Sequence, residues 1–438
     1  MAAAGAWWGA GIDIACSNLA LDDGPAQRCR RLSAEPQPRL RQGEFVALMA
    51  LMMSLTVLAI DAMLPALAQI GDELGAGHAN QAQLVISALL LGMAAGQVIY
   101  GPLSDSIGRK PTIYAGLVLF VCGCALSLAA TSLPLMLLGR VLQGFGAAAP
   151  RIVVVALVRD EYAGAAMARI MSLVLTTFIL VPMLAPAVGQ GILLVAHWRA
   201  IFAMLLALGL VGLVWFALRQ PETLPLERRV RFSLARILLG VRETCANRVA
   251  LGYTIAAGLI FGAFLGYITS SAQIFLSQYG VGRLFPVYFG GLALAIGAAT
   301  YVNSRLVIRY GMQRLSALAV GALGGCSAVY FAIAWATAGD PPLWSLMPYL
   351  GVAFFCFGLV FGNFNALAME PLGHIAGVAA AVVGTITSVM SLTLGTLIGQ
   401  SYDGTVLPLI AGFAVLGLGS LAAMRWAERG RPISGSRA

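Results

Sequence analysis

The chain contains twelve apolar runs, each long enough to cross a bilayer as a helix, and this series constrains its fold more than any other feature. A spanning helix needs about twenty apolar residues, and a backbone in lipid must satisfy its own hydrogen bonds, which favours helices. The runs lie at residues 45–68, 81–100, 112–130, 133–158, 171–194, 200–218, 250–275, 285–303, 315–336, 343–369, 375–398 and 406–424. The sequence therefore predicts an all-α integral membrane protein with twelve transmembrane helices.

Composition excludes several other classes of protein. Hydrophobic residues make up 60% of the 438 positions and charged residues 10%, whereas soluble domains carry about 25% charged residues. The histidines and cysteines show no spacing typical of a metal site. The only lysine, Lys110, is followed by Pro111, so the chain lacks the Gly-Lys-Ser/Thr sequence of a P-loop. We expect no cofactor, no metal and no ATPase activity of its own.

The net charge of +9 indicates topology rather than a nucleic-acid partner. If the chain spans twelve times, one side carries only Arg199 and Arg283. Loops rich in positive charge are typical of the cytoplasmic side, so we predict that both termini are cytoplasmic. The arginines on that side are Arg28, Arg30, Arg31, Arg39, Arg41, Arg159, Arg169, Arg305, Arg309, Arg314 and those within 219–248 and 425–437.

The longest polar connection, residues 219–248, divides the chain into two similar halves. Residues 304–311 repeat the loop after the second run at an offset of 203, and residues 395–400 repeat residues 185–190 at an offset of 210. Two echoes at nearly the same offset indicate an internal repeat. We predict two pseudo-symmetric six-helix bundles (44–218 and 249–427), a cytoplasmic linker between them and a tail at 428–438. In a membrane protein built from two such repeats, a binding site is expected between the repeats near mid-membrane.

Residues 1–43 lack the basic segment and apolar core of a signal peptide. Their prolines and arginines predict a disordered cytoplasmic arm. An over-extended start codon explains the segment equally well.

The polar segment 101–110, GPLSDSIGRK, separates the second and third runs. Because it cannot lie in hydrocarbon, we predict a tight turn between two spanning helices. Its form, G-x-L-x-D-x-x-G-R-K, resembles the loop signature of the major facilitator superfamily. The resemblance implies that Arg109 pairs with Asp160, at the end of the fourth helix. We further expect Asp105 to face the N-terminus of the eleventh helix, so that Gly101, Asp105, Gly108, Arg109 and Asp160 form a conformational latch; the alternative is a solvated charged turn.

Asp61 and Arg140 are the candidates for proton coupling. A carboxylate inside a spanning helix costs about 2.5–3.5 kcal/mol, so Asp61 is expected to face a watery cavity or a partner; the alternative is an interfacial residue near the helix end. Arg140 lies in the sequence Arg140-x-x-Gln143-Gly, which resembles the superfamily's R-x-x-Q-G motif. It is a fixed cation that we expect to tune Asp61, unless it only anchors backbone carbonyls.

Further polar residues of the spanning runs are candidates for the substrate cavity, against the alternative of ordinary helix packing. Arg151 lies about three turns beyond Arg140 and on roughly the same face. The predicted cavity residues are Gln143, Arg151, Tyr253, Tyr267, Asn363 and Asn365. In the fifth run, Pro182, Pro186 and Gly189 form a relaxed version of the G-P-x-x-G-G motif found in antiporters of the superfamily.

Taken together, the chain resembles the twelve-helix drug:proton antiporters of the superfamily, of the bicyclomycin-resistance (Bcr/CflA-like) type. The resemblance implies a monomer in the bacterial cytoplasmic membrane that exports small amphipathic compounds in exchange for protons. One alternative is a specific exporter or importer of a metabolite on the same fold. A membrane enzyme or receptor is a more remote alternative, because the three histidines are not placed for catalysis, and we expect no enzyme.

Overall fold

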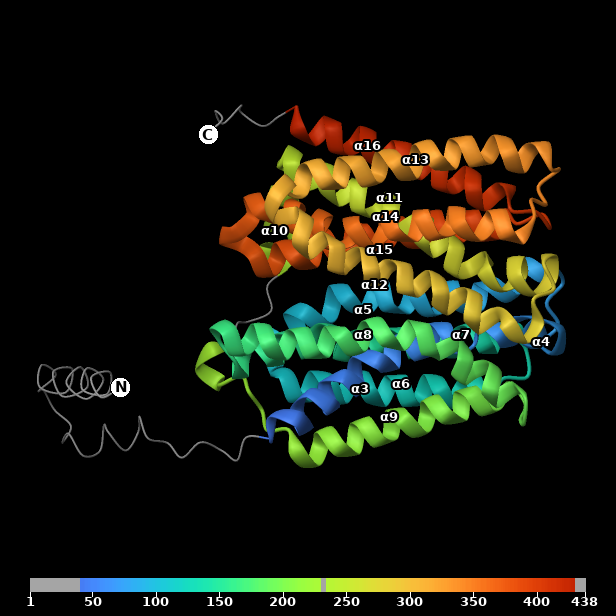
Figure 1. Ribbon diagram of the computed structural model, residues 1–438. Helices are drawn as coiled ribbons and strands as arrows, with labels where there is room; N and C mark the ends of the chain where they lie inside the picture. Colours follow the sequence, from blue (N-terminus) through green and yellow to red (C-terminus); the bar gives the residue numbers. More distant parts are fainter. Residues whose placement is uncertain (1–39, 230–233, 430–438) are drawn as a thin grey trace, which may run out of the picture. The chain divides into compact units, whose positions relative to one another are not determined.

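The computed structural model describes residues 40–229 and 234–429, which form twelve long α-helices and no strand. The predicted arm up to residue 39 and the tail from residue 430 lie outside the described residues. The long helices are α3 (Gln42–Asp61), α5 (Leu84–Ile107), α6 (Arg109–Leu128), α7 (Leu133–Glu161), α8 (Gly164–Leu193), α9 (Arg199–Arg219), α11 (Arg248–Ala272), α12 (Phe285–Tyr310), α13 (Met312–Ala336), α14 (Leu343–Met369), α15 (Ala376–Gln400) and α16 (Leu407–Glu428) (Figure 1).

Shorter helical segments extend or join these helices. They are η1 (Leu64–Ala66), α4 (Leu67–Glu73), η2 (Ala79–Gln83), η3 (Leu226–Arg228), α10 (Leu234–Ala246), the π-helical η4 (Gln273–Gln278), η5 (Gly282–Leu284) and η6 (Glu370–Ile375). α10 lies in the connection for which the sequence predicts only a polar linker. It contacts α11 and α15, and its Glu243 pairs with His374 of η6.

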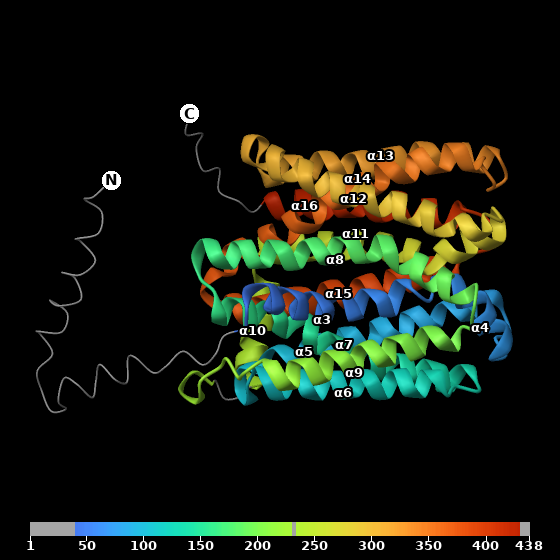
Figure 2. The ribbon, with the colours of Figure 1, turned by 60° about the horizontal axis from the view of Figure 1, so that its bottom comes forward.

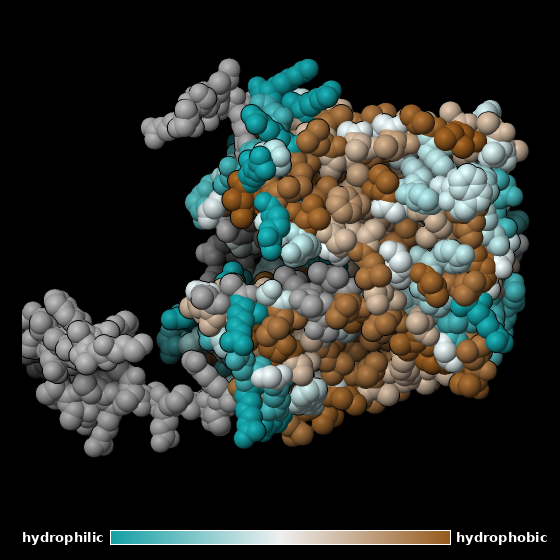
Figure 3. Space-filling model, in the orientation of Figure 1, coloured by the Kyte–Doolittle hydropathy of each residue, from teal (hydrophilic) through white to brown (hydrophobic). Residues whose placement is uncertain are grey.

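The surface of the helices suits a lipid environment. Eleven described segments are long and apolar enough to cross a membrane, and the apolar part of α8 adds the shorter Leu180–Leu193. Large apolar side chains on outer helices are exposed, including Leu318 on α13, Val415 on α16 and Val214 on α9. Figure 3 shows hydrophobic residues over the middle of the helices and hydrophilic residues gathered at both ends. The predicted fold class, an all-α multi-pass membrane protein with twelve long helices, is confirmed.

Helix contacts divide into two groups joined by two helix pairs. In the first half, α7 packs against α5 and α6, and α6 packs against α9. In the second half, α11 packs against α15 and α16, while α14 contacts α12 and α13. Between the halves, α5 contacts α15 and α8 contacts α12 (Figures 1 and 2).

The polar segment 101–110 is more helical than the tight turn that the sequence predicts. α5 continues through Pro102 to Ile107, and α6 begins at Arg109, so that only Gly108 lies between the two helices. Gly108 has a φ of +111°, a value that residues other than glycine rarely adopt. We call the end of the helices at Gly108 the loop end. The opposite end holds η1, η2, the start of α5 and the ends of α11 and α15.

Candidate functional site

Arg140 joins three helices of the first half near the opposite end. Its side chain is fully buried. Nε donates to the carbonyl of Val85 on α5 at 3.1 Å, and Nη2 donates to the carbonyl of Ala59 on α3 at 2.8 Å. Nη1 donates to Oε1 of Gln143 at 2.5 Å. The guanidinium therefore binds backbone carbonyls. On α3 it binds the carbonyl of Ala59, two residues before Asp61, and not the Asp61 carboxylate.

Asp61 ends α3 at a contact between the halves. Its side chain is 5% exposed, and no hydrogen bond of its carboxylate appears among the described residues. η1, which follows directly, contacts α11 of the second half. On the other side, α8 approaches so closely that a Cβ on Gly189 would lie 1.7 Å from the carbonyl oxygen of Ala62. The end of α3 that carries this carboxylate thus lies where elements of both halves approach each other.

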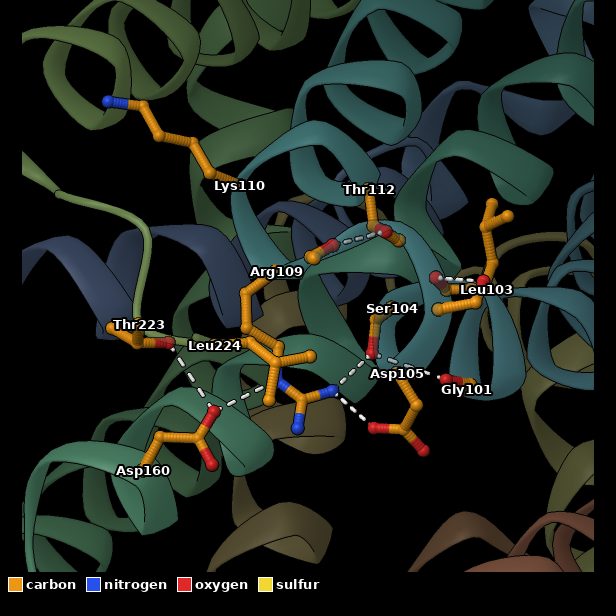
Figure 4. A network of polar contacts seen from close by, with 12 residues as sticks. Gly101, Leu103, Ser104, Asp105, Arg109, Lys110, Thr112, Asp160, Thr223 and Leu224 are labelled. Atoms are coloured by element: carbon orange, nitrogen blue, oxygen red, sulfur yellow. Dashed lines mark hydrogen bonds and ion pairs between the residues drawn. The ribbon is translucent and has the colours of Figure 1, made fainter. Parts of the chain in front are cut away.

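Arg109 is the centre of a polar network at the loop end (Figure 4). Its Nε donates to Oδ2 of Asp160 at 2.9 Å, and its Nη1 donates to Oδ1 of Asp105 at 2.5 Å. Nη1 also reaches the hydroxyl of Ser104 at 2.7 Å. Asp105 is 54% exposed, and its partner Arg109 belongs to the same half. The sequence led us to expect Asp105 to face the N-terminus of the eleventh long helix, which is α15.

Glu222 belongs to the same network, and sequence reasoning missed it. Its Oε1 accepts from the backbone N–H of Arg109 and its Oε2 from that of Lys110, each at 3.0 Å. Oε1 also accepts from the N–H groups of Thr223 and Leu224 at 3.0 Å. Because the first N–H groups of a helix have no partner within it, Glu222 caps α6 from a distant segment. The available signal was an acid directly after Pro221, just beyond α9.

The predicted cavity residues lie at two depths. On α11, Tyr253 and Tyr267 are separated by fourteen residues, or about 21 Å along the axis. Tyr253 lies near the loop end, where its hydroxyl donates to Glu428 at 2.9 Å, while Tyr267 lies near the depth of Asp61. The structure therefore does not bring the two tyrosines together.

The remaining cavity candidates also differ in environment. Asn363 exchanges two hydrogen bonds with Asn303 of α12, at 3.1 and 2.9 Å, so its amide is already satisfied. Asn365 is exposed on α14, and Arg151 is partly exposed on α7. No polar partner of Arg151 appears among the described residues. Gln143 is buried against Arg140.

The proline-containing stretch of α8 lies where the halves meet. Pro182 and Pro186 are accommodated inside one continuous helix, and Pro186 is buried. α8 contacts α12 of the second half and reaches α3 through Gly189. The antiporter-like sequence is therefore a surface of α8 that packs closely against α12 and against the chain just after Asp61.

Neutral amides join the two halves at the opposite end. Nδ2 of Asn80 donates to the carbonyls of Gln400 and Tyr402 at 3.0 and 2.8 Å, and Nε2 of Gln400 donates back to the Asn80 carbonyl at 2.7 Å. Gln273 donates to Oδ1 of Asn80 at 3.1 Å and is also bonded to Gln83. We call these residues the amide network: Asn80, Gln83, Gln273, Gln400 and Tyr402.

The amide network contains no group that titrates near neutral pH. Tyr402 donates to the carbonyl of Gln273 at 3.4 Å. Burial, followed by the charges of Asp403 and Asp340, raises the pKa of Tyr402, so its hydroxyl stays protonated. Over the part of the chain that the structure describes, no group of three or more His, Cys, Asp or Glu residues is placed to hold a metal.

Comparisons with known proteins identify the family. Residues 48–396 match the model of the Major Facilitator Superfamily, and the chain belongs to this superfamily. It is 32% identical over 382 residues to the uncharacterized MFS-type transporter YdgK of Bacillus subtilis, covering 86% of this chain and 93% of that protein. It is 28% identical to a bicyclomycin resistance protein homolog of Haemophilus influenzae, covering 84% of this chain and 91% of that protein.

A solved structure supports the fold independently. The xylose transporter XylE of E. coli, in a partially occluded inward open conformation, superposes with a TM-score of 0.68. The superposition covers 91% of this chain and 99% of the XylE chain, and the two sequences are 13% identical. At that identity the likeness concerns the fold alone. The fold and the family define the protein as a multi-pass membrane transporter.

Proposed function

We propose that the protein exports small amphipathic compounds, such as drugs or toxic metabolites, from the cytoplasm across the bacterial inner membrane in exchange for protons. The observation on which this rests is Asp61, a 5% exposed carboxylate at the end of α3, where elements of both halves approach each other. An ionisable group inside a spanning bundle is costly and is typical of a proton pathway. The protein is a transporter that works as a monomer and is not an enzyme.

Drug export is favoured over metabolite transport by two observations. One relative of the chain is named for resistance to bicyclomycin. In addition, the part-exposed rings of Phe261 and Phe361 stack at 4.3 Å and 12°, which offers an apolar surface to an aromatic or lipophilic compound. A specific metabolite exporter or importer is the second candidate, since fold alone does not define a substrate.

The loop end is assigned to the cytoplasm. Arg159, Arg305 and Arg309 lie at this end together with Arg228 and Arg229 of the linker, whereas Arg199 and Arg283 lie at the opposite end. The positive-inside bias supports this orientation, with both termini cytoplasmic.

The two six-helix bundles alternate access by moving against each other. The amide network ties the outer end of α5 to the ends of α11 and α15. At the loop end, Arg109 is bonded within its own half. These contacts support an inward-facing state, in which cytoplasmic cargo enters the cavity.

Export follows if Asp61 binds a proton and cargo alternately. Facing outside, the carboxylate takes a proton and releases cargo; facing inside, it loses the proton and accepts new cargo. Arg140 acts by holding α3, because its bond to the Ala59 carbonyl lies two residues from Asp61. Proton and cargo can each shift the balance between the two states only by their difference in affinity for them, and the proton gradient supplies the energy for export.

The test has two assays. One measures export of each compound from cells of a pump-deficient host, and the other measures gradient-driven uptake into everted vesicles. The panel contains bicyclomycin, chloramphenicol and ethidium, together with polar metabolites. We expect the wild type to concentrate a drug of the panel in a proton-dependent manner and Asp61→Asn to lose this activity while remaining expressed. Asp72→Asn, an exposed acid on α4, is the matched control. Proton-driven accumulation by Asp61→Asn would overturn the assignment, and transport of metabolites alone would favour the second candidate.

A further inference from the structure

The contact between α5 and α15 carries hydrogen bonds well beyond the amide network. Oγ1 of Thr396 donates to Oγ of Ser87 at 3.0 Å. Ten residues further along α5, or about 15 Å closer to the loop end, Oγ of Ser388 donates to Oε1 of Gln97 at 3.0 Å. This is the innermost hydrogen bond between α5 and α15 in the described part of the chain. Gln97 therefore marks the depth at which the two halves last hold each other along this pair of helices.

Gln97 faces the interior of the protein and not the lipid. The lipid-facing side of α5 is marked by exposed apolar residues such as Leu91 and Ile99, at 53% and 43%. With 3.6 residues per turn, Gln97 points nearly opposite to the direction midway between those two side chains. Its neighbour Gly96 packs on α7, where a Cβ would lie 2.7 Å from Cβ of Ala148. The part-exposed amide of Gln97 therefore opens between α7 and α15, which belong to different halves.

Gln97 lies at nearly the same depth as Arg151, a predicted cavity residue. The contacts between α5 and α7 follow the same order along both helices, so the two helices run in parallel. Gly96 meets Ala148, Gln97 is one residue beyond Gly96, and Arg151 is three residues beyond Ala148. The two side chains thus differ in depth by about 3 Å along the helix axes.

An aromatic surface of the second half lies close to this depth. α11 and α15 also run in parallel, and a Cβ on Gly258 would lie 2.9 Å from Cβ of Met390. Ser388 precedes Met390 by two residues, whereas Phe261 follows Gly258 by three. The stacked rings of Phe261 and Phe361 are therefore about 7–8 Å beyond Ser388 towards the opposite end. One drug-sized molecule can reach both the rings and the amide of Gln97.

We propose that Gln97 determines cargo specificity by donating a hydrogen bond from Nε2 to an acceptor oxygen of the cargo, and that Ser388 positions it. Because Ser388 binds Oε1, the amide is oriented with Nε2 turned away from that bond, and no partner of Nε2 appears among the described residues. Gly384, one turn before Ser388, leaves space beside the amide, since even a Cβ there would lie 3.8 Å from Oε1.

This proposal rests on the proposed export function and names its substrate class. An amide donor that faces apolar surroundings without a partner is costly, so a cargo that offers a carbonyl oxygen is favoured over one that does not. The preferred cargo is a lipophilic compound with an aromatic or apolar body for the Phe261–Phe361 surface and a carbonyl group for Gln97. A planar cation without a carbonyl gains only the contact with the rings.

Equilibrium binding to the purified protein tests the proposal with three compounds. Bicyclomycin and chloramphenicol carry carbonyl groups, whereas ethidium is a planar cation without one. We expect Gln97→Leu to weaken binding of the two carbonyl compounds about fivefold, the factor that one neutral hydrogen bond is worth, and to leave ethidium binding unchanged. Equal losses for all three compounds would show a merely structural role and overturn the proposal, as would a wild type that binds neither carbonyl compound.

Two further variants separate contact from positioning. Ser388→Ala should cause the same selective loss by a smaller factor, and adding it to Gln97→Leu should change nothing further, because Ser388 acts through Gln97. Ser87→Ala is the matched control: it removes an equivalent bond between the same two helices, so a loss that arises from loosening the halves would appear there too. If the wild type binds the compounds as expected but never moves them with protons, the proposed function fails and the specificity of Gln97 stands.

Discussion

The carboxylate of Glu222 caps the backbone N–H of Arg109 at 3.0 Å, although 113 residues separate the two along the chain. The linker after α9 therefore helps to build the loop end. Arg109 in turn bonds both Asp105 and Asp160, so one helix start, one arginine and three acids form a single unit. The unit links α5, α6 and α7 to the connection between the halves.

Replacing Glu222 should destabilise this unit. Glu222→Ala leaves the N–H groups of Arg109 and Lys110 without an acceptor, so we expect the free energy of unfolding to fall by about 1–3 kcal/mol. Thermal unfolding in detergent measures the effect. Glu222→Gln, which keeps one acceptor oxygen, should lie in between. Glu227→Ala, an exposed acid of the same linker, is the control and should match the wild type.

The two glycines of the loop signature should respond to alanine in opposite ways. At Gly108, φ is +111° and a Cβ would lie 2.5 Å from Oε2 of Glu222. Gly108→Ala should therefore cost about 1 kcal/mol or more. Gly101 is inside α5 with open space at its Cβ position, so Gly101→Ala should be neutral or stabilising by up to about 1 kcal/mol. Equal losses of stability in both variants would contradict this account.

The sequence predicts those features that depend on neighbouring residues, and it does not predict contacts between segments that are distant along the chain. The helices follow from apolar runs, and the resemblance implied the contact between Arg109 and Asp160. Glu222 was missed because the N–H groups of Arg109 and Lys110 that donate to it are distant in sequence, and nothing local distinguishes it from a solvated acid. The amide network was missed for the same reason, since Asn80 and Gln400 meet only when the halves pack at that end. Tyr253 was grouped with Tyr267 because hydropathy does not reveal depth.

Asp105 should matter for conformational change more than for stability. Its contact with Arg109 is half exposed and worth about 1 kcal/mol or less. Asp105→Asn should therefore insert and fold normally, but transport more slowly and rest in the inward-open state, because the proposed latch closes the loop end in the other state. Cysteine accessibility at the loop end measures the resting state. If Asp105→Asn transports at the normal rate, the latch hypothesis is wrong and the alternative, a solvated charged turn, holds.

The amide network should control the opposite end. Asn80→Ala removes two donated hydrogen bonds and the acceptor of Gln273. We expect the outward-open population to rise at least about tenfold, since three neutral hydrogen bonds are lost and each contributes about 0.5–1.5 kcal/mol. Because its members are neutral, the shift should change little with salt or between pH 5 and 8. Spin-label distances across the opposite end report it, and a strong salt dependence would show that charges hold this end instead.

Arg140→Lys should abolish proton-driven export although the positive charge is kept. The guanidinium serves three acceptors at once, the carbonyls of Val85 and Ala59 and the amide oxygen of Gln143. A compact ammonium cannot reproduce this fork, so at least one buried carbonyl loses its partner and the end of α3 that carries Asp61 is no longer held in place. Each lost bond to a charged group corresponds to about 1.5–3 kcal/mol, which predicts at least a tenfold loss of transport rate.

Gln143→Leu provides the graded comparison for Arg140→Lys. It removes only one of the three acceptors, so its transport rate in everted vesicles should lie between those of the wild type and Arg140→Lys. Both variants should reach the membrane at normal levels, because the helices themselves are unchanged. A normal rate in Arg140→Lys would mean that positive charge alone suffices at this position, and the bracing of α3 would then have no part in coupling Asp61 to transport.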